Sequence, residues 1–241
     1  MNVVCFEYKA KYGHFLRAEA NANGVTYSVP PRTALLGLIA AVLGLPKDAL
    51  ARELADAHVA LGGALPRRFW HKTNVRKDPP SPLPWRVKAT DKGSSSEQRN
   101  FRFPQEWLWQ PCYRVWASLP GTHQADFVAR LRDRRWHFSP CMGLSEMLAE
   151  LDFLHVGDAD PLPMGTYSIG SVTVQGQDYG QIDTSKASEA GLTLQSLRMP
   201  FSVTEDRVFH HRTYWLEHRG RPFPFETGRA WRIGSDEVIF L

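Results

Sequence analysis

The 241-residue sequence contains only three cysteines, Cys5, Cys112 and Cys141. Their odd number and scattered positions fit neither a disulfide framework nor a zinc-binding spacing. The longest apolar run, residues 33–45, contains two glycines and is too short to span a bilayer. No charged segment followed by a cleavable apolar stretch opens the sequence. These absences predict a cytoplasmic protein with no disulfide framework and no membrane association.

Nucleotide-binding and hydrolase signatures are also missing. The sequence has no GxxxxGK[ST] loop, no GxSxG turn and no CxxC pair, and its nine histidines do not cluster with cysteines or carboxylates at ligand spacing. We therefore predict no metal and no cofactor. The enzymatic chemistry that remains is metal-independent RNA cleavage, with a general base and acid drawn from Tyr27, His71, Lys72 or His210. Simpler interpretations exist, with Tyr27 as a packing residue and His71 and Lys72 as phosphate contacts.

Positive charge is concentrated in one segment. Residues 66–102 carry ten Lys or Arg and three Asp or Glu, whereas residues 137–205 carry two basic and nine acidic side chains. Aromatic residues, among them Trp70, Trp85 and Phe101, are interleaved with the basic ones. Cations beside aromatic rings suit single-stranded nucleic acid, because phosphates attract the charge and unstacked bases pack on the rings. The alternative is a solvated basic loop without a ligand.

Hydrophobic periodicity predicts a mixed α+β fold. The order strand, helix, strand, arm, strand, helix, strand matches the split βαβ plan of ferredoxin-like domains, which RNA-recognition folds share. Residues 144–156 have the spacing of a helix and the composition of a strand, so both remain open at this point. The other expected elements are strands at 2–8, 58–65, 112–118, 166–175, 192–203, 208–217 and 229–241, and helices at 33–44, 46–57 and 122–135, the last capped by Thr122.

Two backbone features suit an anionic ligand. Residues 28–33 lead into the helix at 33–44, whose first amides are unpaired and whose dipole favours an anion, with Arg32 and Thr33 beside them. Residues 140–146 form a turn in which Gly143 allows a ligand to approach the backbone closely. Ordinary helix capping and a plain connecting loop are the alternatives.

Four segments together resemble the Cas-five family, subunits of CRISPR Cascade complexes in the RAMP superfamily. Residues 27–44, YSVPPRTALLGLIAAVLG, look like the family signature, and the Pro-Pro-Arg-Thr variant is most similar to type I-B members. The other segments agree in order and spacing: WHKTN at 70–74, RNFRFPQEWL at 99–108 with PCYRVW at 111–116, and PCMGLSE at 140–146. The match spans residues 1–156 and fades beyond them. It favours a loop followed by a strand for residues 140–156.

The resemblance implies an α+β chain in two parts. Residues 1–160 would form a ferredoxin-like (RRM/RAMP) domain, and residues 66–110 within it a long basic hairpin, the thumb. Residues 161–241 would form a smaller C-terminal β lobe.

The implied function is that of a non-catalytic subunit that holds the five-prime handle of the CRISPR RNA. Its expected partners are this RNA, the Cascade backbone subunit whose filament it caps, the Cascade large subunit and target DNA. The alternative is a metal-independent endoribonuclease that processes CRISPR precursor RNA, as in type I-C systems. The RNA-binding residues implied at the helix start, thumb base and glycine loop are Tyr27, Ser28, Arg32, Thr33, Lys72, Asn74, Arg76, Arg99, Asn100, Arg102, Cys141, Met142, Gly143 and Ser145.

Overall fold

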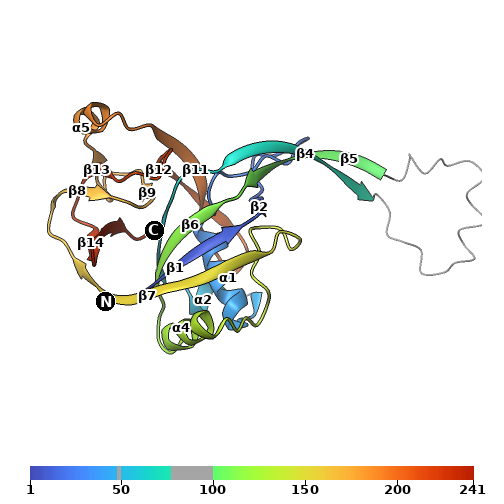
Figure 1. Cartoon of the computed structure of the whole chain (residues 1–241), viewed down its shortest axis with the longest axis horizontal. Helices are drawn as coiled ribbons and strands as arrows, with labels where there is room; N and C mark the ends of the chain where they lie inside the picture. Colours follow the sequence, from blue (N-terminus) through green and yellow to red (C-terminus); the bar gives the residue numbers. More distant parts are fainter. Residues whose placement is uncertain (48–49, 77–99) are drawn as a thin grey trace, which may run out of the picture.

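The computed structural model describes residues 1–47, 50–76 and 100–241 (Figure 1). Its main sheet has six strands in the order β15-β14-β7-β1-β6-β3. The pairs along this order are all antiparallel. The strand bounds are β1 Asn2–Ala10, β3 His58–Gly62, β6 Cys112–Ser118, β7 Ala149–Pro161, β14 Ala230–Ile233 and β15 Asp236–Ile239. The predicted strands at 2–8 and 112–118 are confirmed, and residues 140–156 do form a loop followed by a strand.

Strand β1 is buried on both faces because it lies at the centre of this sheet. Val4 and Phe6 point to the face covered by helices α1 (Arg32–Leu43), α2 (Leu50–Glu53) and α4 (His123–Asp133), and the Phe6 ring packs edge-on against Phe127 of α4 at 5.6 Å (Figure 1). Val3 and Cys5 point to the other face, against Trp116. This alternation is what a strand between two apolar layers requires.

The two longer helices match the sequence predictions closely. Helix α1 ends at Gly44, whose left-handed backbone (φ 81°) lets its amide donate to the carbonyls of Ala40 and Ala41. Helix α4 buries Phe127, as its spacing predicts, but Thr122 at its N-cap makes no side-chain capping bond. Among the described residues, no helix is long and apolar enough to cross a membrane.

The strands between β7 and β14 form two three-stranded sheets, β10-β13-β8 and β11-β12-β9. The strands predicted at 192–203 and 208–217 correspond to β11 and β12, whereas the one predicted at 166–175 is divided into β8 and β9. The bounds are β8 Gly165–Ile169, β9 Thr173–Val174, β10 Gln181–Ile182, α5 Thr184–Glu189, β11 Leu194–Val203, β12 Phe209–Glu217 and β13 Phe223–Thr227. Strand β13 and helix α5 are short, and the sequence pattern did not predict them. One core cluster joins residues before and after position 160, so the predicted division into two domains stays a prediction.

Strands β4 (Arg67–Arg76) and β5 (Asn100–Trp109) pair along their whole length and extend away from the body of the molecule (Figure 1). Strand β2 (Tyr12–Gly13) pairs with the base of β5. We call this β2-β5-β4 sheet the ribbon. It occupies the place in the chain where the sequence predicts a basic hairpin.

A buried arginine links four parts of the chain. Arg32, at the start of α1, is 8% exposed, and its guanidinium donates to the carbonyls of Leu241 (2.9 Å), Ala57 (2.9 Å) and Phe201 (3.3 Å). It also lies 5.2 Å from the centre of the Phe201 ring. Burial lowers the pKa of Arg32 from its ordinary value. These bonds hold the start of α1 against β11, the C-terminal residue Leu241 and the segment before β3.

Replacing Arg32 by Met is expected to lower the free energy of unfolding by about 3 kcal/mol, because two buried carbonyls and one half-buried carbonyl lose a charged donor. Urea denaturation followed by circular dichroism measures the loss. The control is Arg135→Met, which removes an exposed arginine paired with Asp133 and should cost less than about 0.5 kcal/mol. Equal stability of the two variants would contradict the structural role of Arg32.

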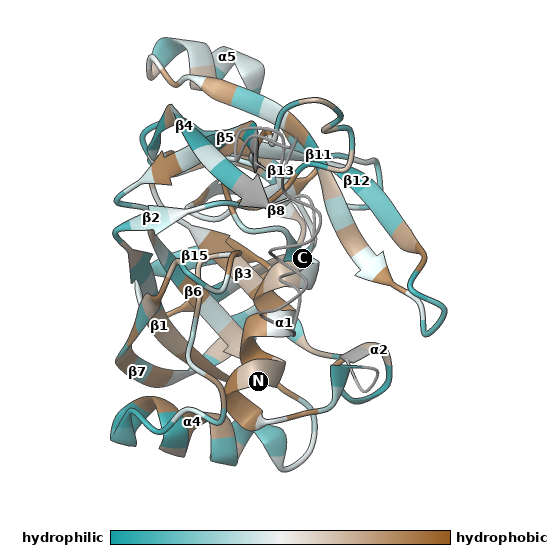
Figure 2. Cartoon of the chain, turned by 90° about the vertical axis from the view of Figure 1, so that its right-hand side faces the viewer, coloured by the Kyte–Doolittle hydropathy of each residue, from teal (hydrophilic) through white to brown (hydrophobic). Residues whose placement is uncertain are grey.

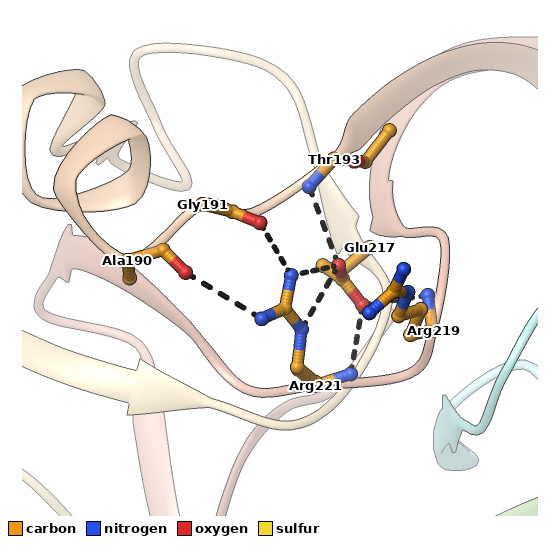
Figure 3. Close-up of polar contacts among 6 residues, drawn as sticks. All are labelled: Ala190, Gly191, Thr193, Glu217, Arg219 and Arg221. Carbon is orange, nitrogen blue, oxygen red and sulfur yellow. Dashed lines mark hydrogen bonds and ion pairs between the residues drawn. The ribbon is translucent and has the colours of Figure 1, made fainter.

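A buried carboxylate closes the turn between β12 and β13 (Figure 3). Glu217 is 3% exposed and accepts hydrogen bonds from the amides of Arg219 (2.7 Å), Arg221 (2.9 Å) and Thr193 (3.3 Å). The Arg221 guanidinium also contacts it at 3.1 Å and donates onward to the carbonyl of Gly191 at 2.6 Å. Burial raises the pKa of Glu217, but the amide and guanidinium bonds outweigh burial and hold it below its ordinary value.

The Glu217→Gln variant is expected to lose about 2 kcal/mol of stability at neutral pH, because the amide group offers one acceptor oxygen in place of two. The folded pKa is depressed, so the contribution is complete above the ordinary value of 4.5 and disappears as the pH falls through the lower folded pKa. Urea unfolding at about pH 7 and about pH 3 should therefore show the gap between wild type and variant closing in acid. Glu189→Gln, at the exposed end of α5, serves as the control. A gap independent of pH would contradict this role.

Candidate nucleic-acid interface

A groove with a cavity volume of about 860 Å³ runs along the outer side of α1. Its floor consists of small α1 residues, Ala34, Gly37 and Ala41, followed by Gly44. The β11–β12 hairpin lies beside this mostly hydrophobic helix (Figure 2) and contributes one wall. Three large side chains stand exposed at its edges: Leu16 (59%), Phe138 (57%) and Phe209 (42%). The groove is therefore open and apolar.

The charged groups along the groove are basic. Lys47 and Arg207 line it together with the imidazoles of His14 and His137, and no carboxylate side chain is among the described residues that form its wall. Arg207 has a left-handed backbone (φ 61°) and holds its guanidinium 6.0 Å from the ring centre of Phe209. An apolar floor with cationic edges suits a ligand that combines flat rings with negative charge.

Three of the sequence-predicted RNA-binding residues line this groove: Tyr27, Thr33 and Gly143. Thr33 is half-buried in the first turn of α1. Tyr27 is 1% exposed, and its hydroxyl accepts a hydrogen bond from the Ala18 amide at 3.4 Å. Burial raises the pKa of Tyr27, so the phenol stays neutral at physiological pH. Its ring belongs to the groove wall.

Three other predicted residues are buried in contacts within the chain. Ser28 is 4% exposed, and its carbonyl accepts from the Tyr113 hydroxyl at 2.8 Å. Met142 is fully buried in the main core. The Arg32 guanidinium is occupied by the three carbonyls described above. Their contact with RNA stays a prediction, since the structure shows these three residues buried in contacts within the chain.

The turn that contains Gly143 packs directly on His14, which follows β2 and lines the groove. The His14 amide donates to the Met142 carbonyl at 3.0 Å, and the Met142 amide donates to the Met147 carbonyl at 2.7 Å. Gly143 has φ +92°, and a Cβ there would overlap the carbonyl oxygen of His14. The close backbone approach predicted at Gly143 exists, but within the chain itself.

The two predicted residues that flank this turn are accessible. Cys141 is half-buried with its thiol 3.4 Å from the Ser139 carbonyl, and burial raises its pKa. Ser145 is exposed and donates to Glu146 at 3.3 Å.

The predicted thumb residues form a separate group on the ribbon. Lys72, Asn74 and Arg102 are exposed, and Asn74 is paired in register with Arg102. Because side chains alternate between the two faces of a strand, these residues lie on the same face of the ribbon as Trp70, which is 55% exposed. Arg76 and Asn100 form the outermost backbone pair of β4 and β5, and Arg99 lies outside the described residues.

The residues considered for RNA cleavage do not form one cluster in the described contacts. His71 packs on the Trp107 ring, with centroids 4.0 Å apart, while Lys72 alternates to the opposite ribbon face. Tyr27 is buried, and His210 lies on β12. The described residues also contain no group of three or more His, Cys, Asp or Glu side chains able to hold a metal ion.

Sequence reasoning missed the groove residues Lys47, Phe138, Arg207 and Phe209. They come from three distant segments, so no local spacing connects them. The available local signal was weak: Val208 and Phe209 are consecutive apolar residues at a strand start, and both are exposed.

Structural comparison places the fold among CRISPR proteins. The chain superposes on a chain of a CRISPR RNA-guided surveillance complex with a TM-score of 0.54 and 17% identity, covering 91% of each chain. It also superposes on a CRISPR protein from Archaeoglobus fulgidus with a TM-score of 0.58 and 14% identity, covering 100% of this chain and 99% of that one. No match was found among curated proteins.

The family follows from the sequence itself. Residues 3–210 match the family model described as CRISPR-associated protein (Cas_Cas5). The chain belongs to the Cas-five (Cas5) family of CRISPR-associated proteins, as the segments quoted above predict.

Replacing Gly143 by Ala is expected to lower the unfolding free energy by more than about 2 kcal/mol, because the methyl group meets the His14 carbonyl and the backbone is left-handed. The control is Gly121→Ala, which has φ +58° but no atom within 4 Å of the added carbon. Thermal unfolding of both variants separates the overlap from the backbone strain. A Gly143→Ala variant no less stable than Gly121→Ala would contradict the close packing of this turn.

Proposed function

We propose that this protein is a non-catalytic RNA-binding subunit of a Cascade-type CRISPR surveillance complex, closest to type I-B. The observation that carries the proposal is the family match over residues 3–210. In this proposal β7-β1-β6-β3 with α1 and α4 is the ferredoxin-like core, since this strand order and helix placement suit that plan. The ribbon is the base of the thumb. The partners are the CRISPR RNA, the backbone and large subunits and target DNA, within the cytoplasm.

The groove along α1 is the proposed seat of the RNA handle. Its apolar floor accepts an unstacked base, and the edge cations Lys47 and Arg207 neutralise neighbouring phosphates. Thr33 and the Gly143 turn stand at the same groove, where the family resemblance implies handle contacts. Lys72, Asn74 and Arg102 supply further polar contacts on the ribbon.

The absence of catalysis is part of the proposal. A base and an acid must stand within hydrogen-bond reach of one phosphodiester. Tyr27 is neutral and buried, and the His71 ring rests on Trp107, whereas Lys72 projects from the opposite face. This arrangement favours binding over cleavage.

The Gly37→Leu variant tests the groove directly. A Cβ at Gly37 has no atom within 4 Å, so the leucine fills the groove without disturbing the core, and leucine favours the helix. It should weaken binding of the host repeat RNA at least tenfold in a gel shift. Arg207→Ala should lower the slope of log affinity against log salt by about 0.7, the value for one phosphate contact of a single strand.

Ala125→Leu, on the exposed side of α4, is the matched control and should bind RNA normally. The same RNA is incubated with the wild-type protein in EDTA and resolved on a denaturing gel. Intact RNA supports a binding subunit. A discrete cut that His71→Ala or Lys72→Ala abolishes would instead establish a processing ribonuclease, and unchanged binding by Gly37→Leu would refute the groove assignment.

A further inference from the structure

One face of the ribbon carries an aromatic cluster that the proposed handle site does not use. We call Tyr12, Phe69, His71, Trp107 and Trp109 the aromatic face. Cross-strand pairs Phe69–Trp107 and Arg67–Trp109 put these side chains on one side, opposite Lys72 and Asn74. The face stands clear of the groove along α1, since none of its residues lines that groove.

The rings are held in fixed positions by one another. The Tyr12 ring lies 5.4 Å from both Trp107 and Trp109, and Phe69 lies 6.0 Å from each, all at inclined angles. Trp107 Nε1 donates to Gln105 Oε1 at 3.3 Å, and Thr73 Oγ1 donates to the same oxygen at 2.9 Å. Trp109 is 40% exposed and His71 is exposed, so the cluster keeps ring surface open to solvent.

The charge beside these rings is positive. The Lys11 ammonium lies 5.5 Å from the Tyr12 ring centre, and Arg67 stands exposed in register with Trp109. Glu106, the carboxylate in this part of β5, faces the other way, where it pairs with Arg68 at 3.3 Å and accepts from the Thr26 amide at 3.2 Å. Rings flanked by cations are the arrangement that binds single strands through base stacking and phosphate neutralisation.

We propose that the aromatic face binds an unpaired DNA strand by stacking, without reading its sequence. The Gln105 oxygen is already occupied by Thr73 and Trp107, while a ring surface accepts any base. Such a face suits a strand whose sequence varies from target to target better than the constant handle of a guide RNA. The choice of DNA rather than the RNA handle as the ligand rests on the proposed function. The inference that bases stack on the aromatic face rests on the geometry of the ribbon alone.

The test uses the purified full-length chain and labelled oligo(dT) and oligo(dA) of about 15 nucleotides, followed by fluorescence anisotropy. Trp109→Leu should weaken binding of both oligomers about tenfold, the loss expected for one stacked base. Trp70→Leu is the matched control, because Trp70 is a more exposed tryptophan of the same ribbon on the opposite face. Trp109→Phe should restore most of the affinity, and His71→Ala provides a second, solvent-exposed test should Trp109→Leu fail to fold.

Several outcomes would overturn the proposal: normal DNA binding by Trp109→Leu and His71→Ala, equal losses in Trp109→Leu and Trp70→Leu, or a loss confined to oligo(U) RNA. A Trp109→Leu protein that binds DNA normally but fails to assemble with other subunits would make the face a protein contact instead. Ala125→Leu, on the exposed side of α4, should leave oligo(dT) binding unchanged. If the handle RNA is not bound while oligo(dT) binding still depends on Trp109, the proposed function fails and stacking on this face survives.

Discussion

The guanidinium of Arg32 determines how the rest of this molecule is arranged around α1. It stands at the first turn of the helix and donates to carbonyls from Ala57, Phe201 and Leu241, which are far apart in the chain. Because the fork of donors is planar and rigid, the three acceptors must stay in a fixed relation to the helix. The β11–β12 hairpin is thereby held beside α1, and the groove between them exists only in that arrangement.

The same interaction explains why a residue expected to bind RNA is buried. An arginine beside a helix start suits a phosphate, but it equally suits backbone carbonyls that have no other donor. Here the second use prevails, and the positive charge available to a ligand comes from Lys47 and Arg207 on the groove edge. Gly37 and Ala41 have no side chain or a very small one, so they leave open space along α1, and this space forms the groove.

The local pattern of the sequence was enough for the regular elements. The β-forming residues at 2–8 and the alternation at 112–118 predicted β1 and β6, and the apolar run between Pro31 and Gly44 predicted α1. Family resemblance resolved the ambiguous segment 144–156, which contains the first part of β7. The short elements β13 and α5 escaped because five or six residues carry too little periodicity to stand out from a loop. The burial of Ser28 and Met142 could not be predicted from local spacing, because burial depends on which segments pack against a residue from elsewhere in the chain.

The sequence by itself determined the order of the main elements up to β7, the family and the concentration of positive charge in residues 66–102. These properties are local or compositional, so they can be recognised without knowing which segments meet. Only the tertiary structure decided which side chains reach a ligand. Leu16, Phe138 and Phe209 meet at one groove, and Tyr12 meets Phe69 and Trp109 on one ribbon face, because strand pairing and the Arg32 contacts bring distant segments together. The spacing of residues along the chain does not predict such contacts, because they form only when the sheet and helices pack.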